Sequence, residues 1–357
     1  MNDAQDLRRA SMNDAQDGRR ASMNDAQDGQ RASATAAGEQ PGRGRAGRAR
    51  VVVSGASGLI GGALVASLRR DGVEVLRLVR RQARQSDEVS WSPGEPSDGS
   101  VPLDPAALAG ADAVVCLNGA SIGRLPWTRG YREVLRRSRI APTRTIATAI
   151  RALGADAPAF LSASAVGVYG DRPGERLTES SRAPRGAERT FLGELCEEWE
   201  REALAAGPHS RVVLLRTAPL LHRRGVLKPL IALTRFGLSG PLGTGRQFWP
   251  WISLDDEVRA IRHLIDSELS GPVNLVGPTP ASANDTGRAL ADAMHRPFLL
   301  PAPAWALRLG LGREAADSLL LADALVQPRA LLDSGFAFAH ATPEDAIASA
   351  LSAPAAG

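Results

Sequence analysis

Three regularly spaced glycines, Gly55, Gly58 and Gly61, stand between a run of valines at 51–53 and an apolar-periodic segment. The valine run is typical of a buried parallel strand. Gly55 permits a tight turn, Gly58 lets the backbone approach a pyrophosphate, and Gly61 lets a helix pack onto the strand. A helix N-terminus also attracts phosphate. The pattern predicts the phosphate loop of a dinucleotide site, formed by Gly55, Ser57, Gly58, Leu59, Ile60 and Gly61.

The end of the next strand selects the cofactor. A helix to Arg70 and a turn at 71–72 lead into an expected strand at 73–79, which Arg80 and Arg81 follow. An NAD site usually places Asp or Glu there for the ribose 2′-hydroxyl, whereas arginines suit a 2′-phosphate. We therefore predict NADP(H), held by Arg80 and Arg81. The alternative interpretation is a solvated strand edge.

Composition limits the other classes of function. The chain has 357 residues, 43% of them hydrophobic, and a formal net charge of +4. This length allows one large α/β domain and a smaller lobe. No stretch approaches the roughly 18 consecutive apolar residues of a membrane span, and the basic residues are interspersed with acidic ones. We expect a small-molecule substrate, no nucleic acid and no membrane as partners; a homodimer stays open.

Cysteine and histidine usage indicates no metal site. Cys116 and Cys196 lie in no metal-ligand spacing, and the five histidines are scattered. Both cysteines are interpreted as buried apolar positions, as expected in a reducing cytoplasm. A cytoplasmic location also agrees with the lack of an apolar signal segment near the first residue.

Residues 1–49 differ from the rest of the chain. They contain three consecutive copies of an 11-residue unit, MNDAQDLRRAS, MNDAQDGRRAS and MNDAQDGQRAS, followed by a Gly/Arg-rich run. The units are polar and too short to stack into a solenoid, so we predict a disordered tail. A tandem duplication around the translation start explains the repeated Met; a basic tether or phosphorylation site is the functional alternative.

Strand and helix patterns alternate from residue 50 to residue 217. Expected strands at 111–117, 159–163 and 212–216 are separated by expected helices at 131–153 and 191–206. This order predicts a Rossmann-type, doubly wound α/β fold with a parallel sheet. Because ligands bind at the carboxyl ends of such strands, Asn118 and Gly119 should lie beside the cofactor.

Residues 218–352 are predicted to form a smaller, α-rich substrate lobe with a late Rossmann strand near 271–276. The segment 225–251 is rich in Gly, Pro and aromatic residues. Ser253 with Asp256 is typical of a helix N-cap that opens a helix at 254–265. Further helices are expected at 281–294, 303–311, 313–325 and 343–351.

Taken together, segments across residues 50–352 resemble the atypical, extended short-chain dehydrogenases/reductases described as epimerase-family proteins with a C-terminal domain of unknown function. The resemblance implies a Rossmann NADP(H) domain with a small C-terminal lobe. The chain departs from the family pattern at Asn118, where Ala is usual, and at Ser253, where His is usual. The matching segments are SGASGLIG, VSWSP, LPWT, SASAVGVYGD, FLGELCEEWE, LLRT, GRQFWPWISLDD, GPVNLVGP and SGFAFAH.

The proton relay of standard short-chain dehydrogenases is missing. They use a Tyr whose pKa is lowered by a Lys four residues later. The family pattern places Phe191 and Leu195 at those positions, and the single lysine, Lys228, has no Tyr four residues before it. Tyr169 is the remaining candidate acid/base, with Ser162 or Ser164 as its hydroxyl partner. The alternative is that Tyr169 is structural.

Two functions therefore stay open. The first is an NADP(H)-dependent oxidoreductase or epimerase acting on an unidentified nucleotide sugar or carbonyl compound. The second is an NADP(H)-binding sensor or scaffold without turnover. An anionic, ring-bearing substrate could be held by ion pairing and stacking, or the same side chains could pin the loop and cap the sheet. These side chains are Arg216, Arg246, Trp249 and Trp251.

Overall fold

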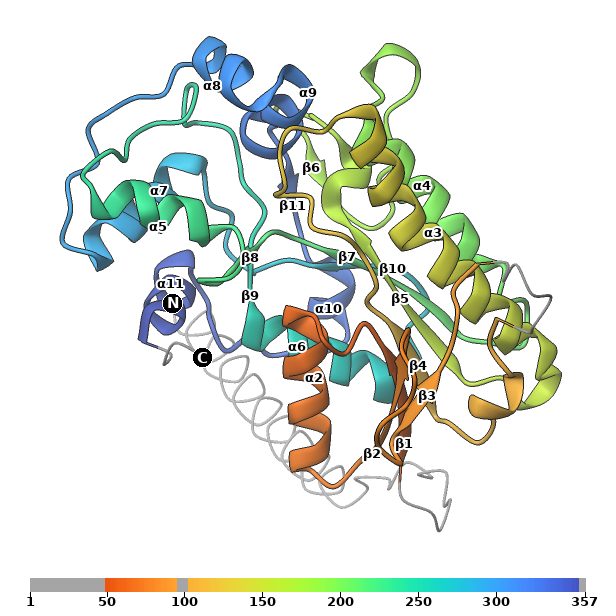
Figure 1. Cartoon of the computed structure of the whole chain (residues 1–357). Coiled ribbons are helices and arrows are strands. Elements are labelled where there is room, and N and C mark those ends of the chain that lie inside the picture. The colour runs from red at the N-terminus through yellow and green to blue at the C-terminus, as the bar shows by residue number, and fades with distance from the viewer. Residues whose placement is uncertain (1–48, 95–101, 353–357) are drawn as a thin grey trace, which may run out of the picture. The chain divides into compact units, whose positions relative to one another are not determined.

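A seven-stranded parallel sheet forms the centre of the protein (Figure 1). The computed structural model describes residues 49–94 and 102–352. The prediction for residues 1–48 lies outside this range. The strand order is β10-β7-β5-β4-β1-β2-β3, so β2 and β3 lie on one side of β1 and the later strands lie on the other. The strands are β1 (Arg50–Ser54), β2 (Glu74–Val79), β3 (Glu88–Ser90), β4 (Ala113–Cys116), β5 (Ala159–Ala165), β7 (Val212–Thr217) and β10 (Gly271–Leu275).

Helices cover both faces of this sheet because its strands are apolar on both sides. On one face, α2 (Leu59–Arg70), α6 (Leu254–Asp266) and α10 (Arg329–Asp333) contribute to one buried cluster with β1 and β5. On the other face, α3 (Arg129–Ala152) and α4 (Phe191–Leu204) pack against each other and on β5. The predicted doubly wound α/β fold is confirmed.

A smaller α-rich lobe follows β7. Its elements are α5 (Leu227–Arg235), α7 (Ala283–Ala293), α8 (Ala304–Leu311), α11 (Pro343–Ser352) and the short paired strands β8 (Leu220–Leu221) and β9 (Ile252–Ser253). Trp251 lies in the apolar cluster that α7 and α11 share. The predicted cap of α6 is confirmed, since Ser253 Oγ accepts a hydrogen bond from the Asp256 amide at 3.0 Å.

The expected helix at 313–325 is wrong beyond residue 321. It comprises α9 (Arg313–Ala316) and a wider turn of π-helix at Asp317–Leu321, and the chain then becomes extended. The physical reason is a pairing with distant residues. β11 (Leu325–Val326) pairs with β6 (Arg176–Leu177), and the Asp323 amide donates to Asp171 Oδ1 at 2.7 Å. Among the described residues, no helix is both long and apolar enough to cross a bilayer.

Candidate functional site

The glycine loop leaves no space for side chains at two of its three glycines. Gly55 has a φ of +83°, and a Cβ there would lie 2.7 Å from the Leu117 carbonyl. A Cβ on Gly61 would lie 2.3 Å from the Gly55 carbonyl oxygen. The Gly58 amide closes the turn by donating to the same oxygen at 2.9 Å. The loop therefore has the tight turn and the close helix packing that a pyrophosphate site needs.

The N-terminus of α2 is open. Gly58 occupies the N-cap position, no side chain caps the helix, and its first turn has no acidic residue. Leu59 and Ile60 lie in this first turn, and Ser57 is exposed just before it. Backbone N–H groups at such an end need an acceptor and favour an anion. This end of the helix therefore fits a pyrophosphate.

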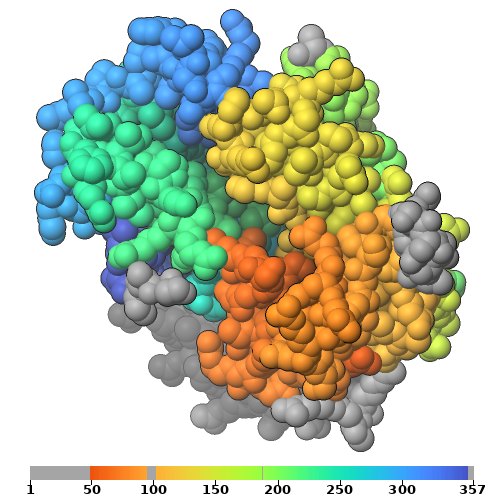
Figure 2. Space-filling view, in the orientation of Figure 1, coloured from red at the N-terminus to blue at the C-terminus, as the bar shows by residue number. Residues whose placement is uncertain are grey.

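Asn118 and Gly119 lie at the same edge of the sheet. The hydroxyl of Ser54, the last residue of β1, donates to Asn118 Oδ1, which ties the ends of β1 and β4 together. Gly119 is exposed. Figure 2 shows a hollow in the surface between the red segment that contains the glycine loop, the yellow segment and the green segment. The carboxyl ends of parallel strands form such a crevice.

The two arginines after β2 differ in their contacts. The guanidinium of Arg81 donates to both carboxylate oxygens of Glu88, at 2.8 and 2.7 Å. This hydrogen bonding lowers the pKa of Glu88 to about 2. Arg80 is exposed and has no hydrogen-bond or ion-pair partner among residues 49–94 and 102–352. Arg80 is thus available for a ligand, whereas Arg81 is held by the protein.

Apolar packing fills the place of the missing Tyr/Lys pair. Leu195 is buried in a cluster with Trp127, Leu135 and Trp199, and Phe191 packs against it. The ring of Phe191 meets that of Trp127 edge to face, with centroids 5.9 Å apart. The start of α4 therefore presents hydrocarbon at the positions where the relay would lie.

Tyr169 lies in the interior. Its side chain is fully buried, and its hydroxyl accepts a hydrogen bond from Arg216 Nη1 at 2.9 Å. The hydroxyl also lies 2.7 Å from Asn274 Oδ1 and 3.0 Å from the Thr178 carbonyl oxygen, its possible acceptors. Burial raises the pKa of Tyr169. A phenol that is enclosed in this way is suited to a structural role, the alternative that the sequence left open.

Ser164 and Arg216 belong to the same buried network. Arg216 forms a two-pronged ion pair with Glu200, at 2.8 and 2.9 Å, and Ser164 Oγ donates to Glu200 Oε1 at 2.7 Å. Ser162 lies on β5 with Ser164 and is fully buried, and its hydroxyl lies 3.4 Å from the Ala163 carbonyl oxygen. The structure thus brings Tyr169, Ser164 and Arg216 together inside the protein and leaves none of them exposed.

The segment with two tryptophans is anchored at both indoles. Trp251 Nε1 donates to the Thr279 carbonyl at 2.9 Å, and Trp249 Nε1 donates to the Leu320 carbonyl at 3.0 Å. Trp251 is buried, and Trp249 is half-buried. Arg246 is exposed. Of the four predicted substrate contacts, Arg246 is the most available.

Besides Glu88, the buried acids Glu200 and Glu257 were missed from the sequence. Glu200 lies on the buried stripe of α4 with Cys196 and Ala203, and an acid on such a stripe could have signalled a buried pair. Glu257, in the first turn of α6, resembles an ordinary N-terminal acid in sequence. It is fully buried and accepts from Thr217 Oγ1 at 2.8 Å, and its Oε2 has no hydrogen-bond partner among the described residues. Burial raises the pKa of Glu257 to about 8.

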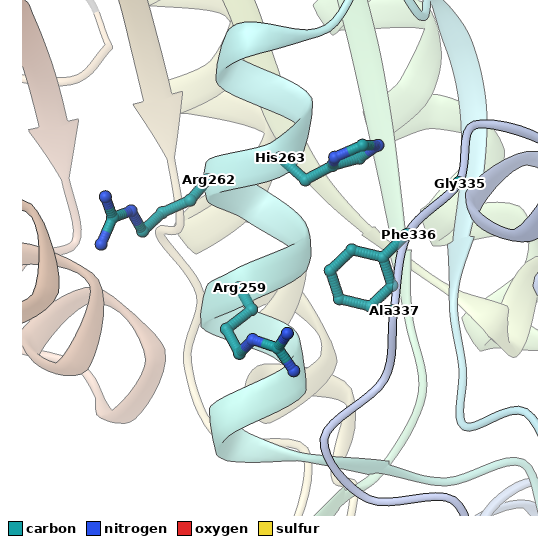
Figure 3. A pocket seen from close by; sticks show the side chains of 6 residues that line it. All are labelled: Arg259, Arg262, His263, Gly335, Phe336 and Ala337. Atoms are coloured by element: carbon teal, nitrogen blue, oxygen red, sulfur yellow. The ribbon is translucent and has the colours of Figure 1, made fainter. Parts of the chain in front are cut away.

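A cavity of about 360 Å³ lies between α6 and the segment 335–337 (Figure 3). Its polar side chains already have partners. Arg259 pairs with Asp256, Arg262 pairs with Asp71, and His263 bonds Ser334. The described residues contain no group of three His, Cys, Asp or Glu placed to hold a metal ion. The uncapped N-terminus of α2 makes the crevice at the carboxyl ends of the strands the candidate site.

Comparisons with known proteins define the class. Residues 51–277 match the model of the NAD dependent epimerase/dehydratase family, and residues 302–350 match a domain of unknown function, DUF1731. An epimerase family protein of Mycobacterium leprae is 39% identical over 310 residues, which cover 86% of this chain and 97% of that protein. The chain therefore belongs to the NAD dependent epimerase/dehydratase family.

Solved structures agree with this class. The human epimerase family protein SDR39U1, crystallised with NADPH, is 26% identical with a TM-score of 0.74, covering 85% of this chain and 100% of that one. MoeE5 in complex with UDP-glucuronic acid and NAD is 23% identical with a TM-score of 0.63, covering 84% of this chain and 96% of that one. The second likeness shows the fold alone.

Proposed function

We propose that this chain is an NADP(H)-dependent oxidoreductase or epimerase of the extended short-chain dehydrogenase type that acts on a small molecule. The observation that carries the proposal is the glycine loop, which excludes a Cβ at Gly55 and Gly61 and leaves the N-terminus of α2 uncapped. The NADPH of the human relative SDR39U1 supports the choice of cofactor.

Different residues of the chain would bind different parts of the cofactor. The first amides of α2 would bind the pyrophosphate. Arg80 would pair with the 2′-phosphate because, of the two arginines directly after β2, it is the one that is not already paired with Glu88. Arg246 would reach the substrate from the lobe. When bound, the nicotinamide supplies or accepts a hydride. The class of substrate that we propose is a nucleotide sugar or carbonyl compound.

A second function, NADP(H) binding without turnover, is favoured by the packing at the start of α4. Phe191 and Leu195 replace the proton relay with hydrocarbon, and Tyr169, the tyrosine that the sequence offered in its place, is enclosed. A sensor or scaffold needs the cofactor site and no proton donor. The same observations on the glycine loop support this second function.

Two measurements separate these functions. Calorimetric titration with NADPH and NADH tests the cofactor site, and we expect the tighter binding for NADPH. Oxidation of NADPH is then followed at 340 nm against a panel of carbonyl compounds and nucleotide sugars. Turnover with any member supports the enzyme, and tight binding without turnover across the panel supports the sensor. If neither NADPH nor NADH binds, both proposed functions are contradicted.

A further inference from the structure

Arg139 is a largely enclosed cation at the edge of the crevice. It lies on α3 and donates from Nη1 to the Leu135 carbonyl and from Nη2 to the Ala120 carbonyl, each at 3.1 Å. Its Cζ lies 5.2 Å from the ring centre of Trp199 on α4. A Cβ on Gly119 would lie 3.1 Å from the same Cζ, so the loop after β4 rests directly on the guanidinium.

No carboxylate neutralises this charge. Among residues 49–94 and 102–352, no Asp or Glu lies within ion-pair distance of Arg139, although Arg136 and Arg144 on the same helix pair with Glu198 and Glu202. Burial lowers the pKa of Arg139, as expected for a cation that loses water without gaining an anion. Burying an unpaired charge is costly, so a retained one calls for a functional explanation.

The sheet order places Arg139 on the β4 side of the crevice, across β1 from Arg80. Arg80 follows β2, on one side of β1, and the expected pyrophosphate site begins at the end of β1. A dinucleotide with its 2′-phosphate near Arg80 must extend across β1 toward β4 and β5. The loop that rests on Arg139 is the one that follows β4.

We propose that Arg139, from α3, supplies the fixed cation of the nicotinamide half and makes the site hold the reduced cofactor more tightly than the oxidised one. This inference rests on the proposed NADP(H) site. The oxidised ring carries a positive charge and the reduced ring is neutral, so a nearby fixed cation repels the oxidised form alone. The phosphates are the same in both forms, and their contributions cancel in the ratio of the two affinities.

The competing role is structural, because Arg139 also holds the Ala120 carbonyl. A structural role would change the affinities for NADPH and NADP⁺ together. An electrostatic role changes their ratio. The ratio therefore distinguishes the two roles, and it can be measured without knowing the substrate.

The experiment measures the dissociation constants of NADPH and NADP⁺ by calorimetry for the full chain and its variants. In Arg139→Gln, we expect the preference for NADPH to fall about tenfold, which is about 1.4 kcal/mol, mainly through tighter NADP⁺ binding. Arg139→Met, which keeps the apolar contact with Trp199, serves as a second neutral variant. Arg139→Lys keeps the charge and should retain most of the preference.

Arg136→Gln is the matched control, since it removes a charge from the same helix that Glu198 already neutralises. Its ratio of affinities should equal that of the unmodified chain. Equal loss of both affinities in the two neutral variants, or a ratio that stays within twofold, would overturn the inference while leaving the cofactor site intact. Absence of dinucleotide binding by the unmodified chain would instead overturn the proposed function.

Discussion

The glycine loop and the buried network around Tyr169 differ in how far the protein satisfies its own polar groups. At the glycine loop, the N-terminus of α2 has no cap and Arg80 has no partner within the described ranges. Around Tyr169, the hydroxyl, the guanidinium of Arg216 and the carboxylate of Glu200 are joined in one buried network. Unsatisfied polar groups are typical of a ligand site, whereas groups that hold the fold are satisfied internally.

This difference changes the meaning of the tyrosine. Its position near the strand ends suits catalysis, but its partners Arg216 and Asn274 give it the role of a buried connector between β7 and β10. We therefore expect changes at the glycine loop to affect cofactor binding and changes in the Tyr169 network to affect stability.

The largest effect is expected at Gly61. In Gly61→Ala, the new Cβ would lie 2.3 Å from the Gly55 carbonyl, so the loop must shift away from its phosphate-binding geometry. We expect NADPH affinity to fall at least ~100-fold and stability to fall by about 1–3 kcal/mol. Calorimetry and urea unfolding measure the two effects.

Gly62→Ala is the matched control, because its Cβ would make an ordinary contact at 3.5 Å with the Ala56 carbonyl. It should keep NADPH affinity and gain roughly 0.5–1 kcal/mol of stability, as an alanine inside a helix usually does. Normal affinity in Gly61→Ala would contradict the assignment of the loop.

The next effect concerns the choice between NADPH and NADH. In Arg80→Ala, we expect about 10- to 100-fold weaker NADPH binding with unchanged NADH binding, because charge-assisted hydrogen bonds contribute about 1.5–3 kcal/mol. Arg81→Ala should keep the preference and lower the melting temperature, since Glu88 loses its two-pronged partner. A preference that is unaffected in Arg80→Ala but lost in Arg81→Ala would reverse these assignments.

A smaller effect, on stability, is expected at Tyr169. Tyr169→Phe removes the partner of Arg216 Nη1 and Asn274 Oδ1 inside the protein, so we expect a loss of about 1–3 kcal/mol in urea unfolding. NADPH affinity should stay unchanged. Tyr131→Phe is the control, because that hydroxyl bonds the Ser121 carbonyl near the surface. Loss of turnover with unchanged stability would show that Tyr169 acts in catalysis.

The smallest effect concerns Glu257, a buried acid whose Oε2 has no hydrogen-bond partner among the described residues. Its pKa is about 8 in the folded chain against a usual 4.5, so the folded state holds the extra proton and stability should fall as pH rises through this interval. Glu257→Gln should remove roughly 1–2 kcal/mol of the decline between pH 6 and pH 9. Asp255→Asn, an exposed acid in the same turn, should leave the decline unchanged.

The sequence predicted the sheet, the glycine turn and the cap of α6 because each depends on neighbouring residues. Valines at 51–53, the spacing of the glycines and the Ser253–Asp256 pair are local signals with local causes. The expected helix at 313–325 was wrong beyond residue 321 because β11 pairs with β6, which lies far away in the chain. Local patterns carry no record of such pairings.

The amino-acid order by itself determined that the chain contains a dinucleotide loop followed by arginines and lacks a Tyr/Lys pair. Tertiary structure alone decided which of those arginines is available to a ligand. Glu88 on β3 neutralises Arg81, whereas Arg80 is exposed and does not pair with Glu88. Tertiary structure also bonded Tyr169 to β7 and β10 and placed Arg139 beneath the β4 loop. The physical reason is that these ion pairs and hydrogen bonds form between residues that are distant in the chain and adjacent in space.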